Sequence, residues 1–191
     1  MTQYICNLAP ISIETAQNQQ KQVLDKALKQ VGFIPNMYKN MANLPALLDT
    51  YLEGYAAFRE QSEFSPAEQE VVFLTISRDN ACQYCVAAHS VLADTMSGVD
   101  TDVTDATDAI RENTDIPDQK LATLHDFTHH VLSTQGRPSQ EAVTIFLESG
   151  YSEKHILAII LAISVKTLSN YSNHIFNTEV DAMFDGRTWH K

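Results

Sequence analysis

Apolar residues recur at intervals of three and four positions through most of this sequence, and this spacing places them along one face of an α-helix. One such stretch carries the apolar side chains Leu47, Leu48, Tyr51, Leu52, Tyr55 and Phe58. Strands would instead show a strict alternation of apolar and polar residues between hairpin turns, and no stretch of the sequence has that pattern. The periodicity therefore predicts an all-α protein.

Helix-capping and helix-breaking residues set the boundaries in the first part of the chain. We expect Ser12 to cap a first helix that runs to Val31. Gly32 and the turn at residues 35–36 should end that helix. Pro45 fits the first turn of a second helix, where its missing N–H has no helical partner to lose.

The next boundaries lie around residues 65 and 80. Ser65 and Glu68 have the spacing of a capping box, which predicts the start of a third helix. That helix should end at residues 77–80, where Asp79 or Asn80 can cap a fourth helix that continues to about Met96. Short acidic helices are expected between residues 94 and 118. Further helices are predicted over residues 117–134, 139–149 and 152–176.

We interpret residues 1–191 as a single domain, because a chain of this length can bury one substantial core. A faint internal repeat appears when residues 65–85 are laid over residues 152–172. On this overlay Cys82 and Cys85 fall on Ser169 and Ser172. Two interpretations stay open: residues 65–96 and 152–176 are copies of one helical unit, or two buried amphipathic segments share small and apolar residues by composition.

Charge and hydropathy narrow the range of partners. The formal net charge is -11, so a phosphate backbone would be repelled over most of the surface, and we expect no nucleic-acid partner. The longest apolar run, residues 156–165, has about half of the roughly 20 residues that a transmembrane helix needs. The first residues lack the basic start and apolar run of a signal peptide. We expect a cytoplasmic protein that binds no membrane.

The acidic segment between Asp94 and Asp118 holds eight acidic residues and one basic residue, Arg111. We interpret it as a solvated face. A calcium loop at Asp100, Asp102 and Asp105 is disfavoured, because the glycine and the terminal glutamate of such a loop are missing.

The chemistry of the sequence is concentrated in a Cys-x-x-Cys motif formed by Cys82 and Cys85. Three cysteines cannot all pair within one chain, which argues against a secreted disulfide scaffold and favours a catalytic or metal-binding pair. Cys6, the third cysteine, is expected to be a free thiol without a role. The motif lies at the predicted start of a helix, where unpaired N–H groups stabilise a thiolate.

His89 and Glu70 complete the candidate site. His89 lies four residues after Cys85 on the same helix face, where an imidazole can take the thiol proton and return it. Glu70 lies on the preceding predicted helix, and a tight connection would bring its carboxylate back toward the pair. A carboxylate alone would raise a thiol pKa, so we expect Glu70 to act through His89.

Half of a zinc site has the same Cys-x-x-Cys spacing, so a zinc-binding module is an alternative. His89 would be a third ligand, and the sequence offers no second Cys-x-x-Cys pair as a partner. His125 and His129 share one helix face beside Asp126 and His130, but no third ligand is identifiable. We therefore expect neither a metal nor another cofactor.

The stretches Ser65–Glu70, Ser77–Cys85 and Val86–His89 resemble the signature of the AhpD-like alkylhydroperoxidases within the carboxymuconolactone decarboxylase family. Residues 32–36 and 150–152 resemble members described as peroxidase-related. The resemblance implies an all-helical fold with a duplicated unit, and assembly into trimers or hexamers. It also implies a proton relay that carries over to Glu70, Cys82, Cys85 and His89, with Cys85 as the attacking thiol and Cys82 as the resolving thiol.

The resemblance predicts a thiol-dependent peroxidase that consumes a hydroperoxide. Its disulfide would be reduced by an external thiol, a lipoyl group or a thioredoxin-like protein. Tyr84 is a departure, because some members have a histidine there, and a tyrosine cannot act as a base near neutral pH. Slower peroxide turnover or a different substrate would follow. The alternatives are a dithiol-disulfide reductase, a redox sensor without turnover, the zinc module, and a lactone decarboxylase, which does not depend on a dithiol.

Overall fold

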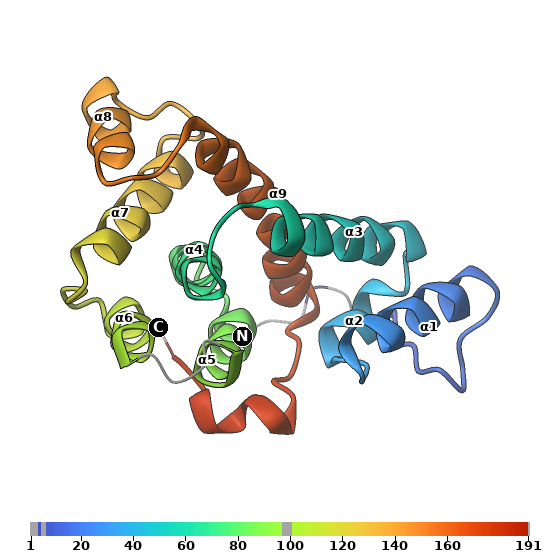
Figure 1. Cartoon of the computed structure of the whole chain (residues 1–191). Coiled ribbons are helices and arrows are strands. Elements are labelled where there is room, and N and C mark those ends of the chain that lie inside the picture. Colours follow the sequence, from blue (N-terminus) through green and yellow to red (C-terminus); the bar gives the residue numbers. More distant parts are fainter. Residues whose placement is uncertain (1–3, 5–6, 97–100, 191) are drawn as a thin grey trace.

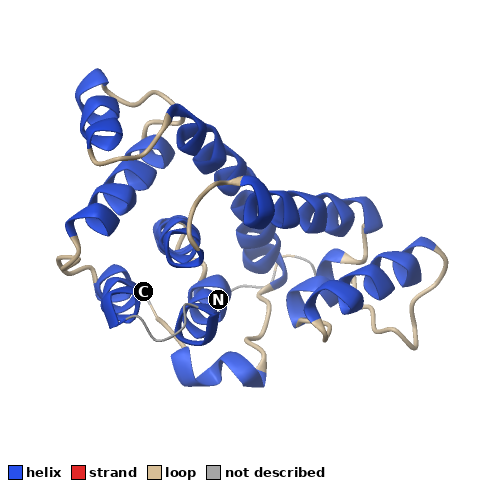
Figure 2. Cartoon of the chain, viewed as in Figure 1, coloured by secondary structure: helices blue, strands red, loops and turns tan. Residues whose placement is uncertain are grey.

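The computed structural model describes residues 4, 7–96 and 101–190. Cys6 and Asp100 lie outside the described residues, so their predicted roles stay predictions. Within the described ranges the chain forms helices and no strand, as Figure 2 shows, and the predicted all-α fold class is confirmed. The helices are α1 (Gln19–Val31), α2 (Asn36–Met41), α3 (Pro45–Gln61), α4 (Pro66–Asp79), α5 (Gln83–Met96), α6 (Thr101–Glu112), α7 (Gln119–Ser133), α8 (Gln140–Glu148), α9 (Glu153–Phe176) and the 3-10 helix η1 (Ala182–Arg187).

Helix α4 is the centre of the fold. It packs against α5, α6, α7 and α9, which surround it in Figure 1. Every residue from Glu68 to Ser77 is buried, as expected of a helix that has neighbours on all sides. Helix α3 crosses and packs against α9, and α1 and α2 pack on the far part of α3. The arrangement leaves α3, α4, α5 and α9 to converge on one interior region.

Local capping signals fix several boundaries as predicted. The Ser65 hydroxyl accepts a hydrogen bond from the Glu68 N–H at 3.3 Å, and the Glu68 carboxylate accepts one from the Ser65 N–H at 2.8 Å. This reciprocal capping box begins α4. Gly32 ends α1 in the left-handed conformation at φ 85°, which a glycine adopts without steric cost. Pro45 occupies the first position of α3.

The predicted start of the first helix is wrong, because α1 begins at Gln19 rather than after Ser12. The Ser12 N–H donates to the Thr15 hydroxyl at 3.1 Å, and the Ala16 N–H donates to the Ser12 carbonyl at 2.8 Å. Hydroxyl side chains of this kind offer the backbone a local alternative to the helix. Residues 12–16 therefore form a separate turn.

The prediction also missed α2, which begins immediately after Pro35. The Asn36 N–H, at the start of α2, donates to both carboxylate oxygens of Asp181, at 3.1 and 3.2 Å. A capping carboxylate that is 145 positions away in the sequence leaves no local signal. A short helix replaces the expected turn.

The predicted cap of the cysteine-bearing helix is wrong as well. Asp79 is the last residue of α4, and Asn80 continues the helical conformation instead of capping α5. The chain reverses through Ala81 at φ 55°, and α5 begins at Gln83, directly after Cys82. The connection is tight, as predicted, and the Cys82 N–H closes it by donating back to the Ser77 carbonyl at 2.8 Å.

Helix α9 runs without interruption for 24 residues, whereas the segment compared with it is divided into α4 and α5. The internal duplication stays a prediction. Among the described helices, α9 is long and apolar enough, by length and composition, to cross a membrane. It packs against α2, α3, α4 and α5 and buries Lys166, Asn170 and Asn173.

Candidate active site

The reversal between α4 and α5 places both cysteines at the start of α5. Cys82 and Cys85 are free thiols with exposed fractions of 0% and 2%. The Val86 N–H donates to the Cys82 carbonyl at 2.9 Å, so Cys82 joins the first turn of the helix. N–H groups in this first turn lack helical acceptors and favour a negative charge on a nearby sulfur.

Helix α9 contributes the polar groups that contact the two sulfurs. The Asn173 side-chain amide donates to Cys85 Sγ at 3.3 Å and lies 3.7 Å from Cys82 Sγ. The Ser169 hydroxyl lies 3.9 Å from Cys85 Sγ. A single amide that reaches both sulfurs shows that the two thiols lie together.

The two thiols differ in acidity. Burial raises the pKa of Cys82, and its contact with Cys85 raises that pKa further. Burial also raises the pKa of Cys85, but the hydrogen bond from Cys82 and the positive charge of Lys166 outweigh it, so that the Cys85 pKa lies well below its ordinary value. Cys85 is therefore the more acidic of the two thiols, and the Cys82 thiol donates a hydrogen bond to it.

Glu70 and His89 meet across the α4–α5 interface, as the sequence predicted for the pair. His89 Nδ1 lies 2.8 Å from Glu70 Oε2, and Glu70 Oε1 lies 2.5 Å from the Arg59 guanidinium. Burial raises the pKa of Glu70, but His89 and Arg59 outweigh it and lower that pKa below its ordinary value. Glu70 is therefore an ionised acceptor.

His89 is a neutral imidazole near neutral pH. Burial lowers its pKa, and the positive charge of Lys166 lowers it further, although Glu70 opposes both. Because the Glu70 carboxylate can only accept hydrogen bonds, it assigns the imidazole proton to Nδ1. Nε2 is left as the basic nitrogen.

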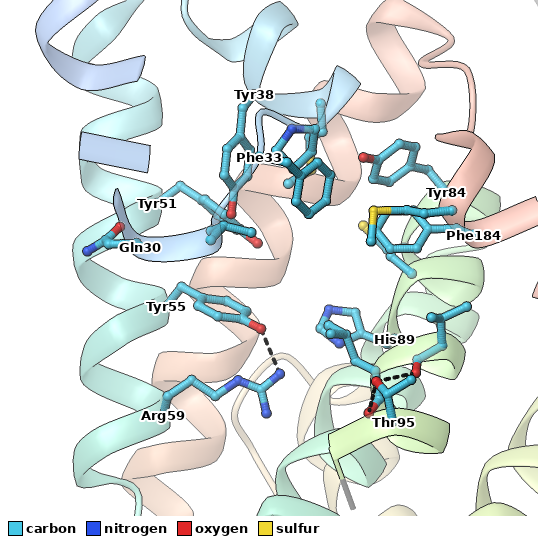
Figure 3. Close-up of a pocket in the computed structure, with 18 of the residues that line it drawn as sticks. Gln30, Phe33, Tyr38, Tyr51, Tyr55, Arg59, Tyr84, His89, Thr95 and Phe184 are labelled. Atoms are coloured by element: carbon cyan, nitrogen blue, oxygen red, sulfur yellow. Dashed lines mark hydrogen bonds between the residues drawn. The ribbon is translucent and has the colours of Figure 1, made fainter. Parts of the chain in front are cut away.

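A cavity of about 600 Å³ opens onto this cluster. Its wall includes Cys85, His89, Arg59 and Lys166 but not Cys82. The aromatic side chains that line it are Phe33, Tyr38, Tyr51, Tyr55, Tyr84 and Phe184. Figure 3 shows His89 on one side of the cavity and Tyr55 with Arg59 on the other. The space is mostly apolar, and Arg59 and Lys166 are the charged side chains among the residues that line it.

The C-terminal segment closes one side of the cavity. Tyr84, between the cysteines, donates a hydrogen bond to Asp181 at 2.5 Å. The Phe184 ring packs edge-on against Tyr84 and Phe33, with centroid distances of 6.1 and 6.3 Å. Burial raises the pKa of Tyr84, and the neighbouring Asp181 raises it further, so Tyr84 stays a neutral donor. Its position supports a role in attaching η1 to α5.

Sequence reasoning missed Arg59, Lys166 and Asn173. Lys166 directly follows the apolar run of residues 156–165 in the sequence, yet its exposed fraction is 1%. Arg59 lies between Tyr55, whose hydroxyl accepts from it at 2.7 Å, and Glu70. A polar residue on the apolar face of a helix was the only available signal, and that signal does not say which neighbour it meets.

The remaining histidines are not gathered into a site. His129 Nδ1 lies 2.7 Å from the Asp79 carboxylate, and His125 Nδ1 lies 2.8 Å from the Thr75 hydroxyl. His130 Nε2 accepts a hydrogen bond from the Ser139 N–H at 3.1 Å. Across the part of the chain that the structure describes, no group of three or more His, Cys, Asp or Glu side chains is arranged to hold a metal ion.

No protein-family model matches this sequence, and no curated protein matches it. Solved structures do. An alkylhydroperoxidase AhpD core described as an uncharacterized peroxidase-related protein from Ralstonia eutropha JMP134 is 20% identical, with a TM-score of 0.77 over 95% of this chain and 96% of that one. An uncharacterized peroxidase-related protein from Silicibacter sp. TM1040 is 17% identical, with a TM-score of 0.74 over 94% of this chain and 91% of that one.

The debrominase Bmp8, in complex with 2,3,4-tribromopyrrole, is also similar to this chain. It is 17% identical, with a TM-score of 0.74 and coverage of 97% of both chains. These likenesses span nearly the whole chain at low sequence identity, which is evidence about fold rather than activity. The chain therefore has the all-helical AhpD-like fold that the segment around Cys82 and Cys85 predicts.

Proposed function

We propose that this protein is a thiol-dependent peroxidase in which Cys85 attacks the substrate and Cys82 resolves the product. The observation that carries the proposal is the unequal access of the two sulfurs. Cys85 lines the cavity, whereas Cys82 does not and lies behind it, within reach of the same Asn173 amide. The more acidic thiol is also the one that a substrate can meet.

The proposed cycle balances without a bound cofactor. The Cys85 thiolate attacks the outer oxygen of a hydroperoxide, the O–O bond breaks, and the alkoxide that leaves takes a proton to become an alcohol. Cys85 is then a sulfenic acid. The Cys82 sulfur displaces water from it and forms a disulfide. An external dithiol reduces this disulfide and is itself oxidised.

Glu70 and His89 serve this cycle as a proton relay. Because Cys85 attacks as a thiolate, the proton for the leaving alkoxide comes from solvent, and neutral His89, with Nε2 as its basic nitrogen, can accept that proton and deliver it. Glu70 holds the imidazole through Nδ1 and stabilises its protonated form. Arg59 keeps Glu70 ionised in its buried position.

The reductant is proposed only by chemical class: a small thiol, a lipoyl group or a thioredoxin-like protein. Assembly into trimers or hexamers also stays a prediction. Helix α9 carries exposed apolar side chains that such an assembly would cover, namely Leu157, Ile160, Tyr171 and Ile175.

A second candidate is reductive dehalogenation of an aromatic compound. The cavity is larger than hydrogen peroxide requires, and six aromatic side chains line it, so an aromatic ring fits its chemistry. The similar debrominase was solved with a brominated pyrrole. In this reaction the dithiol supplies two electrons and the carbon–halogen bond breaks. The products are the aromatic ring with hydrogen in place of the halogen, a halide ion, a proton and the disulfide.

Peroxide consumption with an added dithiol reductant tests the proposal. We expect turnover by the wild type and by Cys6→Ser, the matched control for the third cysteine. Cys85→Ser should be inactive. In the absence of the reductant, Cys82→Ser should consume one equivalent and stop as a sulfenic acid, which dimedone traps and mass spectrometry locates. Wild-type protein that consumes no more peroxide than both mutants would contradict the proposal, and halide release from a brominated pyrrole would favour the second candidate.

A further inference from the structure

Three polar residues of α9 face the dithiol at helical spacing. Ser169 and Asn173 contact the Cys85 sulfur directly. Lys166 lies three residues before Ser169, on the same face of the helix, and lines the same cavity as Cys85. One face of α9 therefore directs a hydroxyl, an amide and an ammonium group toward the region of the sulfurs.

The Lys166 ammonium is buried without a conventional partner. Its exposed fraction is 1%, and within residues 7–96 and 101–190 no hydrogen bond or ion pair of its side chain is found. Its described contact is a cation–π interaction with the Phe73 ring, at 5.5 Å from the centroid. A buried ammonium without an anion is costly, so a structure that keeps one needs a compensating negative charge.

The other charged groups around Cys85 already compensate one another. Arg59 from α3 pairs with Glu70 from α4, and His89 from α5 is neutral. The pKa values of the facing phenols Tyr38, Tyr51, Tyr55 and Tyr84 are all raised, so these groups carry no charge. The half-buried Asp181 carboxylate accepts hydrogen bonds from the Tyr84 hydroxyl and the Asn36 N–H. What remains is one cation on α9 and the cysteine pair.

We propose that Lys166 is the counter-ion of the Cys85 thiolate, a positioning residue that keeps the reduced site ready to attack. Within the fully buried part of the cluster, the Lys166 ammonium then has an anionic partner only while Cys85 is ionised. The catalytic benefit of this ion pair rests on the proposed function, but the ionisation of Cys85 is measurable without any peroxide. A failure of peroxidase activity and a failure of the Lys166 proposal are therefore distinguishable.

The pH profile of Cys85 alkylation tests the proposal. Iodoacetamide reacts with the reduced full-length protein, and mass spectrometry of the Cys85 peptide gives the rate at each pH. For Lys166→Met we expect the Cys85 pKa to rise by at least about one unit, which lowers the rate about tenfold below that pKa. Lys166→Arg keeps the charge and should restore most of the rate. Lys154→Met makes the same change at an exposed position of α9 and should leave the profile unchanged.

A wild-type alkylation profile in Lys166→Met would overturn the proposal, and so would a Lys166→Arg profile that matches Lys166→Met. Thermal unfolding gives a second measurement, which depends on Cys85 rather than on activity. Cys85→Ser leaves Lys166 without its anion, so it should unfold at a lower temperature than the wild type. The double variant Cys85→Ser, Lys166→Met should unfold at a higher temperature than Cys85→Ser alone. A double variant that is no more stable than Cys85→Ser would contradict the pairing.

Discussion

His89 Nδ1 on α5 lies 2.8 Å from the Glu70 carboxylate on α4, and both side chains are buried. The contact spans 19 positions of sequence and the tight reversal at Ala81. It determines the imidazole tautomer, and Glu70 connects His89 to the Arg59 guanidinium on α3. The first predictions follow from this chain of contacts.

Glu70→Gln should destabilise the fold as well as slow the reaction. Glutamine can still accept hydrogen bonds, but it leaves the Arg59 charge unpaired, which costs about 3–5 kcal/mol of unfolding free energy. Urea unfolding measures the loss. Glu63→Gln breaks an exposed ion pair with Lys154 and should change little. Equal effects in the two variants would show that the buried pair has no special weight.

His89→Ala removes the proposed base and one of the groups that lower the Cys85 pKa. We expect peroxide consumption to fall by about 10²–10⁴-fold. We also expect the iodoacetamide profile of Cys85 to move to higher pH. His129→Ala, at an exposed histidine, is the control. An unchanged alkylation profile in His89→Ala would remove His89 from its proposed role.

Stability should fall as the pH drops below the ordinary histidine pKa of 6.5. The pKa of His89 is lowered in the folded state, so its contribution to stability is full above 6.5 and is lost as the pH falls toward the folded pKa. Glu70 adds a second loss at lower pH, below its ordinary 4.5, because its pKa is lowered too. His125 acts in the same direction as His89, since burial lowers its pKa.

Chemical unfolding of the wild type and of His89→Asn across this pH range measures the effect. The variant should lose less free energy of unfolding between pH 6.5 and 4.5 than the wild type does. His125→Gln reports the second histidine separately. Parallel curves for the wild type and His89→Asn would contradict the assignment of His89 as a buried neutral imidazole.

Tyr84→Phe tests the attachment of the C-terminal segment. The variant loses the hydrogen bond to Asp181 and should cost about 1–2 kcal/mol of unfolding free energy. Proteolysis near η1 should become faster, because the Tyr84 ring, against which Phe184 packs, is no longer hydrogen-bonded to Asp181. Tyr171→Phe, at an exposed position of α9, is the control. Wild-type protease resistance in Tyr84→Phe would show that the hydrogen bond does not hold η1.

Gly54→Ala tests the close contact of α3 with α9. An added Cβ would lie 2.8 Å from Val165 Cγ2. Overpacking costs about 1–3 kcal/mol, and the better helix propensity of alanine offsets about 1 kcal/mol, so a net loss of about 1 kcal/mol is expected in urea unfolding. Gly186→Ala meets no atom within 4 Å and is the comparison. A stabilised Gly54→Ala would mean that the two helices separate easily.

The sequence by itself determined the features that depend on near neighbours. Helical periodicity predicted the class of fold, and the capping box at Ser65 and Glu68 predicted the start of α4. The spacing of Cys82, Cys85 and His89 predicted that the three side chains lie on one face of a helix, within two successive turns. Such features are encoded within a few positions, because helix geometry and capping act over one or two turns.

Only the tertiary structure decided what surrounds the dithiol. Arg59, Lys166 and Asn173 come from α3 and α9, and their distance from the cysteines in the sequence gives no indication of contact. Asp181, which follows α9 in the sequence, accepts hydrogen bonds from the Asn36 N–H at the start of α2 and from the Tyr84 hydroxyl. The packing of the helices brings these residues together, and burial strengthens the electrostatic interactions between their charges. The sequence thus predicted the candidate reacting groups, whereas the fold determined which thiol is the more acidic and which one faces the cavity.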